Sequence, residues 1–485
     1  MFETNTMKKL TLLVVTIMFL SSCDGSFLDL TSKEATDGEN AIVDIKSMEY
    51  ATYGLYALAQ NQHYYNRTFY FLPDLISDNV YLSTRTRTYY TELGKFRASA
   101  NHSRSGSQWE QIYRVVVNSN FIIQKGSELE VPEGEMEEKE AMVGEAYAMR
   151  ALAHFDLCRM YAQPYNYTED ASHMGIPLIL ESSLDVDELT FPGRNTVKEV
   201  YEAVVDDLKK AINKLSESVP GESSSFKGRI TVNAAKALLS RVYLYMGEWE
   251  KSRDMATDVI DSEQYSLLPT NQFVDEYSTS NNSESIFEII NTYTDNSGSN
   301  SVDYYYNQDG YGDGLGTMDL YDSYSSSDVR RDFMEIGDRS GGGGEKDVPL
   351  VTKFRKKDGN FEQDVIVIRL AEVYLNRAEA RAHLGEDSKA MDDLDTIAER
   401  SDPDVSIDQS LSGQSLIDRI LLERRKELAF EGHRLFDLMR NKKNFTKYYT
   451  DGESTNVEYH DDKTILPIPE SELDVNDNLD QNPGY

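Results

Sequence analysis

Cysteine and tryptophan are scarce in this 485-residue chain, which contains two of each. Two cysteines are too few for the disulfide framework of a small secreted domain. Cys158 stands among apolar residues in a helical pattern, so we expect a core thiol rather than a reactive one. The seven histidines form neither an HExxH motif nor a Cys/His zinc spacing. We therefore expect no metal site and no cofactor.

Positive charge is also in deficit. Lysine and arginine number 49 against 84 aspartates and glutamates, which gives a formal net charge of −35. A surface with this charge repels the phosphate backbone of nucleic acids, so we expect no nucleic-acid partner. A lectin-like binding body, a scaffold and an enzyme all remain compatible with the composition.

The only long apolar run lies near the start of the chain. Lys8 and Lys9 precede an apolar core over 10–20, which is too short to span a bilayer of about 30 Å. A positive start and a short apolar core before small residues are typical of a secretory signal. The cut point reads LSSC at 20–23 and resembles the lipobox of bacterial lipoproteins.

The lipobox resemblance implies a lipoprotein signal peptide over 1–22, with Cys23 as the lipid-attachment residue of the mature chain. Several acyl chains on one residue would anchor the protein at a membrane more stably than a single chain. An ordinary signal peptide that happens to contain a cysteine is the alternative. Met7 is an alternative start, because Glu3 is unusual ahead of a positive segment.

Helical periodicity dominates much of the remaining chain. Apolar residues recur three and four apart, and Gly247 and Gly385 each separate two such stretches. These pairs resemble tetratricopeptide-like helix pairs, which leave an apolar face for a neighbour to cover. We therefore predict a mainly α fold of stacked helix pairs. The predicted helices cover 135–161, 195–216, 231–246, 250–261, 367–382 and 388–400.

The interval 266–364 lacks this periodicity and is rich in Tyr, Asn, Ser, Gly and Asp. A loop of that length inside a compact chain is usually functional or disordered. No GK[ST] follows the glycines at 341–344, so they do not form a phosphate loop. We predict that this interval is an irregular, loop-rich insert.

Tyrosine is concentrated in two windows. Of 31 tyrosines, eight lie in 53–90 and seven in 293–324. Some are adjacent, at 64–65, 89–90 and 304–306, and adjacent side chains are not expected to face one core together. An exposed tyrosine offers a flat apolar ring and a hydroxyl, which suit the faces and hydroxyl rims of sugars and also suit peptides.

Ordered segments along nearly the whole chain resemble the SusD/RagB family of nutrient-binding outer-membrane lipoproteins. The lipobox is followed by SFLDL, GEAYAMRALAHFDLCRMYAQPY, GRNTVKEVYEAVVDDLKKAI, LLERRKELAFEGHRLFDLMR and the closing NLDQNPGY. The resemblance implies one body over 23–485, with a helical scaffold and an irregular ligand-binding half. It also implies that the protein binds without cleaving, is lipid-anchored at the outer membrane, and passes its ligand to a TonB-dependent, SusC-like barrel.

Glycan sites in this family are typically shallow aromatic arcs, drawn from the segment after the first helix and from the irregular insert. The resemblance therefore carries over regions rather than motif-matched contacts. Within these regions, the ligand-binding candidates of this chain are Asp78, Tyr81, Arg85, Arg87, Tyr89, Tyr90, Tyr305, Tyr306 and Tyr311.

Three other functions remain as alternatives. Arginines and tyrosines alternate at 85–90 and would also suit a peptide, as in RagB-type members. Glu423, Glu427 and Glu431 lie four apart, as the carboxylates of a glycoside hydrolase might on one helix, but the surrounding arginines favour a salt-bridge network. A scaffold that binds only the barrel is the third alternative.

Overall fold

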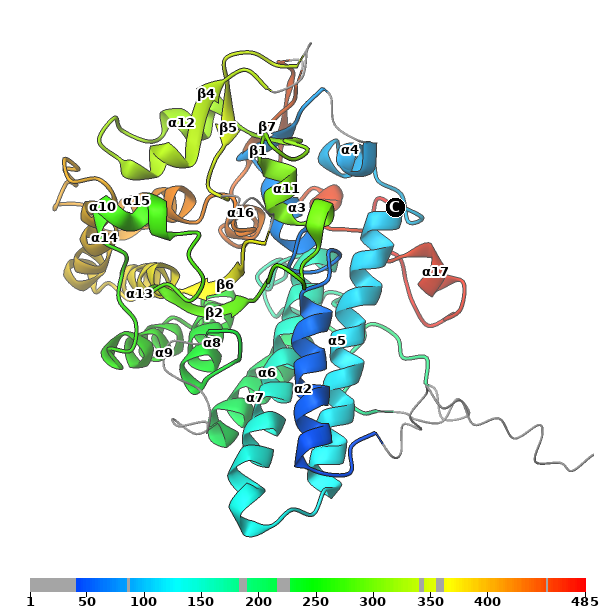
Figure 1. Cartoon of the computed structure of the whole chain (residues 1–485). Coiled ribbons are helices and arrows are strands. Elements are labelled where there is room, and N and C mark those ends of the chain that lie inside the picture. Colours follow the sequence, from blue (N-terminus) through cyan, green and yellow to red (C-terminus); the bar gives the residue numbers. More distant parts are fainter. Residues whose placement is uncertain are drawn as a thin grey trace, which may run out of the picture. The chain divides into compact units, whose positions relative to one another are not determined.

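Figure 1 shows the computed structural model of the chain, in which residues 41–84, 88–182, 190–215, 227–339, 344–354, 362–450 and 452–485 are described. Asp44–Tyr485 form one compact unit. The signal segment 1–22, Cys23, Arg85 and Arg87 lie outside the described residues. Within the described ranges, no helix has the length and apolar character that crossing a membrane requires.

Four long helices run side by side in this unit (Figure 1): α2 (Ile45–Ala59), α5 (Ser103–Glu128), α6 (Met136–Tyr161) and α7 (Val197–Lys214). α6 packs against each of the other three and is buried on nearly all sides. Its Cys158 is 1% exposed, and burial raises the pKa of the thiol to about 12, as expected for a core cysteine. The helices predicted over 135–161 and 195–216 are confirmed.

The predicted helix pair around Gly247 is also confirmed, as α8 (Val232–Met246) and α9 (Trp249–Asp261). The hydroxyl of Thr231 accepts a hydrogen bond from the Ala234 amide at 3.2 Å and so caps the start of α8. Gly247 has a φ of +74°, in the left-handed region that glycine adopts most readily, and this turn reverses the chain.

The second predicted pair consists of α13 (Leu370–His383) and α14 (Asp387–Ser401), with Gly385 at a φ of +73° between them. Both helices share a core with α15 (Gly413–Glu427), and α9 packs against α13. The two pairs are therefore stacked, and the mainly α fold is confirmed. Residues at the centre of this core include Leu375, Ala378, Leu394, Ile397 and Ile420.

One predicted boundary is wrong. Val367 was expected in the helix over 367–382, but it lies in strand β6 (Val365–Arg369), which pairs antiparallel with β2 (Ser285–Ile289). The first four residues of the run VIVIR are β-branched and all five are buried, so the apolar pattern continues into α13 without a visible change of period.

The insert over 266–364 contains short helices and strands rather than loops alone. Three of its strands, β3 (Gly314–Gly316), β4 (Met334–Gly337) and β5 (Val348–Val351), form an antiparallel sheet with β1 (Val80–Leu82), in the order β1-β3-β5-β4. Tyr81 of β1 lies opposite Leu315 of β3. This pairing holds the segment after the first helices against the insert, and so brings the two tyrosine-rich windows together.

The remaining helices and strands are short. They are α3 (Thr68–Leu75), η3 (Thr88–Tyr90), α4 (Thr91–Gly94), η4 (Glu133–Glu135), α10 (Thr270–Glu276), η6 (Gly298–Asn300), α11 (Val302–Tyr306), α12 (Met318–Asp322), η7 (Val329–Phe333), α16 (Arg434–Arg440), β7 (Phe445–Tyr448), β8 (Ser454–Val457), η8 (Asp462–Thr464) and α17 (Glu470–Leu473).

The predicted salt-bridge network is confirmed around Glu427 at the end of α15. Terminal nitrogens of Arg369 and Arg330 lie 2.6 and 2.8 Å from its carboxylate, and Arg400 pairs with it as well. Glu423 and Glu431 are likewise buried and ion-paired. Arginines therefore occupy the three carboxylates that the hydrolase alternative would need.

The expectation that adjacent tyrosines would not share one core is wrong for Tyr64 and Tyr65. Both are buried, and their hydroxyls donate hydrogen bonds of 2.7 and 2.8 Å to the same oxygen of Asp156. These tyrosines belong to the tight turn between α2 and α3. The alternation of faces that a strand imposes does not apply to a turn, so both hydroxyls can reach one carboxylate.

Candidate ligand-binding site

The nine predicted ligand residues differ widely in exposure. Tyr89 is 46% exposed, and Tyr81 and Tyr311 are partly exposed. Asp78, Tyr90, Tyr305 and Tyr306 are buried. Arg85 and Arg87 lie outside the described residues. Direct contact with a ligand at the surface is therefore open to Tyr81, Tyr89 and Tyr311 among the seven that the structure describes.

Asp78 joins two distant parts of the chain. Its carboxylate accepts hydrogen bonds from Arg434 Nε at 2.7 Å and from a terminal nitrogen of Arg434 at 2.8 Å, and Arg425 lies 3.3 Å away. Burial would raise the pKa of this carboxyl, but the hydrogen bonds and charge of Arg434 outweigh burial and lower it. The geometry gives Asp78 a structural role, because its oxygens are already occupied.

Tyr90 and Tyr306 are packed inside the protein. The Tyr90 hydroxyl accepts a hydrogen bond from Arg67 Nε and shares another with Thr68, both at 2.9 Å. The ring of Tyr306 stacks on Phe354 with the ring centroids 5.3 Å apart. These two side chains thus position their neighbours rather than face the solvent.

Six residues from distant parts of the chain form what we call the tyrosine–arginine cluster. Its members are Arg67, Tyr89, Tyr90, Arg104, Tyr305 and Tyr311. The ring of Tyr305 packs edge-on against Tyr90 and Tyr311, with centroid separations of 5.8 and 5.3 Å. η3 supplies two of these tyrosines, whereas α11 and the turn after it supply the other two. The structure therefore brings residues of the two tyrosine-rich windows together.

Two arginines in this cluster were not predicted. The guanidinium carbon of Arg104, in the first turn of α5, lies 4.6 Å from the centroid of the Tyr89 ring. That of Arg67, just before α3, lies 5.0 Å from the centroid of Tyr305. Both distances are within the range of cation–π attraction. Each arginine is isolated in the sequence, so no local pattern marks it as part of a site.

The cluster has a positive electrostatic character. Burial, together with the charges of Arg67 and Arg104, lowers the pKa of His63 to about 4. The pKa of Tyr305 is raised to about 12 by burial, against the opposing effect of Arg67. The two guanidinium groups thus act on the same neighbourhood, and His63 within it is neutral at physiological pH.

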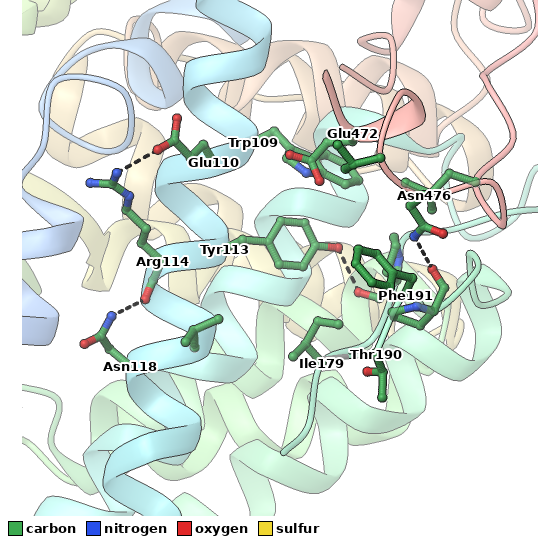
Figure 2. Close-up of a pocket in the computed structure, with 15 residues that line it drawn as sticks. Trp109, Glu110, Tyr113, Arg114, Asn118, Ile179, Thr190, Phe191, Glu472 and Asn476 are labelled. Atoms are coloured by element: carbon green, nitrogen blue, oxygen red, sulfur yellow. Dashed lines mark hydrogen bonds and ion pairs between the residues drawn. The ribbon is translucent and has the colours of Figure 1, made fainter. Parts of the chain in front are cut away.

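A separate apolar groove of about 430 Å³ lies along α5 (Figure 2). Tyr113, Ile179 and Phe191 line it, together with Trp109, which is 3% exposed. Two of its polar side chains bond to backbone carbonyls of the protein. Tyr113 donates to the Pro177 carbonyl at 2.8 Å, and Asn476 donates to that of Pro192 at 2.9 Å. Such a surface suits apolar contact better than a ligand rich in hydroxyls.

A second hollow of about 320 Å³ lies between α4, β1 and β7. The ammonium group of Lys447 at its base donates to the carbonyls of Leu75 and Val80, at 2.5 and 2.6 Å. Burial lowers the pKa of Lys447 to about 7. No cluster of histidine, cysteine or carboxylate side chains that could hold a metal ion occurs in the described parts of the chain.

Solved structures place the fold among known proteins. A SusD superfamily protein of Bacteroides vulgatus is 30% identical, with a TM-score of 0.82 over 92% of this chain and 100% of that one. Another, of Bacteroides thetaiotaomicron, is 29% identical, with a TM-score of 0.80 over 91% and 100%. The chain belongs to the SusD family. The family model described as "SusD family" matches 337–485, and a model described as "Starch-binding associating with outer membrane" matches 26–244.

A curated SusD-family relative, the SusD-like protein P38 of Formosa agariphila, is 26% identical over 258 residues. That alignment covers 53% of this chain and 46% of the relative, so the chain spans about half the length of that protein. The SusD-family matches confirm the resemblance drawn from the ordered sequence segments. The description of the matching family model also associates this family with starch binding and the outer membrane.

Proposed function

We propose that this SusD-family protein binds an extracellular oligo- or polysaccharide at the tyrosine–arginine cluster, without cleaving it. The observation that carries the proposal is the exposed ring of Tyr89, whose centroid lies 4.6 Å from the guanidinium carbon of Arg104. Flat rings beside hydrogen-bond donors suit the apolar faces and hydroxyl rims of sugars. The family model's starch-binding description supports the same class of ligand.

The contrast between the cluster and the apolar groove supports this location. In the groove, Tyr113, Asn476 and Asn118 all donate to backbone carbonyls of the protein. In the cluster, Arg104 Nε and one terminal nitrogen of Arg67 have no hydrogen-bond partner among the described residues. A buried donor without a partner is costly, so both side chains keep hydrogen-bonding capacity that the described residues leave unused.

The proposal extends to the protein's place in the cell. Acylation of Cys23 would hold the body at the outer membrane, in keeping with the outer-membrane description of the matching family model. The captured saccharide would then pass to a TonB-dependent, SusC-like barrel. Mass spectrometry of the protein extracted from membranes tests the anchor, and co-purification with the barrel tests the partner.

A peptide is the second candidate ligand. Arg104, which is partly exposed, can bind a carboxylate as well as a hydroxyl, and a peptide carries a carboxylate at its C-terminus. The same surface would then hold aromatic or proline side chains on Tyr89. Direct binding measurements separate these two ligands.

Calorimetry and affinity electrophoresis of the full chain test the saccharide proposal, with neutral and acidic glycans and mixed peptides as ligands. We expect saturable binding to one glycan class and at least about a fivefold loss in Tyr89→Ala, since truncating an important aromatic contact residue costs more than about 1 kcal/mol. Tyr50→Ala is the control, because Tyr50 is also exposed, at 60%, but lies on α2. Product analysis after incubation checks that the bound glycan stays intact.

Two results would count against the proposal. Equal binding by the wild type and Tyr89→Ala would remove the cluster as the binding surface. Binding of peptides with no binding of any glycan would show that the ligand is a peptide rather than a saccharide.

A further inference from the structure

We propose that the tyrosine–arginine cluster selects saccharides that carry an acidic group, a carboxylate or a sulfate, over neutral ones. This inference rests on the proposed function of the cluster as a saccharide site. The ligand class is inferred from the positive charge of two arginines that have no carboxylate partner among the described residues.

Arg67 is the first observation. It belongs to the five arginines whose side chains are among the largest that are fully buried. The other four each pair with a carboxylate, as Arg241 with Glu372, Arg330 with Asp328, Arg369 with Glu431 and Arg424 with Asp437. Arg67 has no such pair among the described residues, although a buried charge is expected to be paired.

All the hydrogen-bond partners of Arg67 in the described parts of the chain are neutral. Its Nε donates to the Tyr90 hydroxyl at 2.9 Å. One terminal nitrogen donates to the backbone and side-chain oxygens of Asn300, at 3.1 and 3.2 Å, and to Gln62 at 3.3 Å. The other terminal nitrogen has no partner there. The positive charge therefore remains uncompensated.

Arg104 is the second observation, and it lies closer to the surface. Its guanidinium stacks over Tyr89, and its Nε has no partner among the described residues. Arg114, on the same helix, differs because it pairs with Glu110 at 2.7 Å. Arg104 thus presents an unpaired charge beside an exposed ring, whereas the charge of Arg114 is balanced locally.

The neighbours of the two arginines add little negative charge. Glu92 pairs with Arg97 at 3.5 Å, and Asp313 pairs with Arg339 at 3.1 Å. α5 begins one residue before Arg104, and no side chain caps this end of the helix. The positive end of a 26-residue helix therefore adds to the same field.

An acidic sugar would supply the missing charge. Its ring would lie on Tyr89 and its carboxylate or sulfate would meet Arg104, while the buried charge of Arg67 attracts the same group from beneath. The chain as a whole carries a charge of −35. At physiological ionic strength the screening length is about 8 Å, so distant negative charges weaken this local attraction only slightly.

Matched pairs of ligands test the inference on the full chain by calorimetry. One pair is oligogalacturonides and their methyl esters, and the other is sulfated carrageenan oligosaccharides and the same oligosaccharides after desulfation. We expect an acidic member to bind at least about tenfold more tightly than its neutral counterpart, since one charge-assisted hydrogen bond is worth roughly that factor.

Variants assign the preference to the cluster. Arg104→Gln is expected to weaken binding of the acidic member at least about tenfold more than binding of the neutral member, so that the difference within each pair disappears. Arg104→Lys, which keeps the charge but not the planar fork, should retain part of the preference. Arg114→Gln is the control, because it removes one charge from the same helix outside the cluster. Tyr89→Ala should weaken both members of each pair.

The outcomes separate this inference from the proposed function. Equal affinity for the acidic and neutral members, with loss of both in Tyr89→Ala, would overturn the charge preference and leave saccharide binding standing. A preference that survives in Arg104→Gln would overturn the role of the cluster in it. Binding of no saccharide in either pair, or of peptides alone, would overturn the charge preference together with the proposed function.

Discussion

Arg434 donates from Nε and from one terminal nitrogen to the two carboxylate oxygens of Asp78, at 2.7 and 2.8 Å. Asp78 precedes β1 and Arg434 begins α16, so the pair connects two segments that lie far apart in the chain. Such a two-bond pair fixes both distance and orientation. The start of β1 is thereby held to α16 by a buried ion pair.

Replacing Asp78 should therefore affect stability more than ligand binding. Asp78→Ala leaves Arg434 and Arg425 without their buried carboxylate, and we expect a loss of about 3–5 kcal/mol in the free energy of unfolding. Urea denaturation measures this loss. Asp206→Ala is the control, since its pair with Lys210 is exposed and should contribute less than about 1 kcal/mol. A marked loss of ligand affinity in folded Asp78→Ala would show that Asp78 contacts the ligand after all.

Gly432 and Gly385 allow backbone strain to be separated from steric overlap. Both have a positive φ, of +76° and +73°, but an added Cβ would lie 3.0 Å from the Tyr70 carbonyl only at Gly432. Gly385→Ala should cost about 1–2 kcal/mol of stability from strain alone. Gly432→Ala should cost a further 1–3 kcal/mol, roughly, from overpacking. Thermal and urea unfolding of the two variants check the difference, and equal losses would contradict the steric argument.

Glu288 should make the protein less stable as the pH rises. Burial raises its pKa from 4.5 to about 7, so the folded state keeps the proton at a pH where the unfolded state has lost it. The stability due to this group is fully present below pH 4.5 and is lost as the pH rises to about 7. Glu288→Gln should flatten this slope and stabilise the protein by about 2–3 kcal/mol above pH 7.

Urea denaturation across this pH range checks the prediction for Glu288. Burial also raises the pKa values of Asp74 and Asp303, to about 6, but both residues remain in the variant. The difference between the two slopes therefore isolates Glu288. Exposed Glu169 offers a control in Glu169→Gln, which should leave the slope as it is in the wild type. An unchanged slope in Glu288→Gln would exclude a raised pKa at this position.

Tyr90 should influence binding without touching the ligand. It is 1% exposed, and Tyr90→Phe removes the hydroxyl that accepts from Arg67 Nε. We expect a stability loss of about 1–3 kcal/mol, because a buried charged donor loses its partner, and a several-fold loss of glycan affinity as Arg67 shifts. Tyr324→Phe is the matched control, since this buried hydroxyl donates to the Lys426 carbonyl. Equal glycan affinity in Tyr90→Phe and Tyr324→Phe would show that the position of Arg67 does not affect glycan binding.

The sequence predicted the helical scaffold well because its periodicity is local. The glycines at 247 and 385 marked both chain reversals, and the stripes of small and apolar residues gave the faces that pack. Strand β6 was missed because a fully buried strand shows no alternation and runs directly into α13. Tyr64 and Tyr65 were misjudged because a turn can direct adjacent side chains to one partner.

The candidate site was predicted as two regions rather than as a set of contacts. Tyr89, Tyr305 and Tyr311 came from local enrichment in tyrosine, which the sequence displays directly. Whether a given side chain is exposed depends on partners far away in the chain, as Arg434 shows for Asp78. Arg67 and Arg104 were missed for the same reason. What sets these two arginines apart is that no carboxylate pairs with them among the described residues. This can be seen only in the folded structure, because the pairing carboxylates of other arginines come from distant parts of the sequence.

The pairing of β1 with β3 joins segments that lie far apart in the sequence. Residues 80–82 and 314–316 can meet only after both have been synthesised, and the proposed site takes Tyr89 and Tyr90 from one window and Tyr305 and Tyr311 from the other. A chain that has synthesised only its first helices therefore contains the tyrosines of the first window but not the complete tyrosine–arginine cluster. During refolding, we expect ligand binding to recover only when these distant segments have paired, which is a slow step because the contact is long-range. Recovery of binding would therefore report formation of the β1–β3 contact.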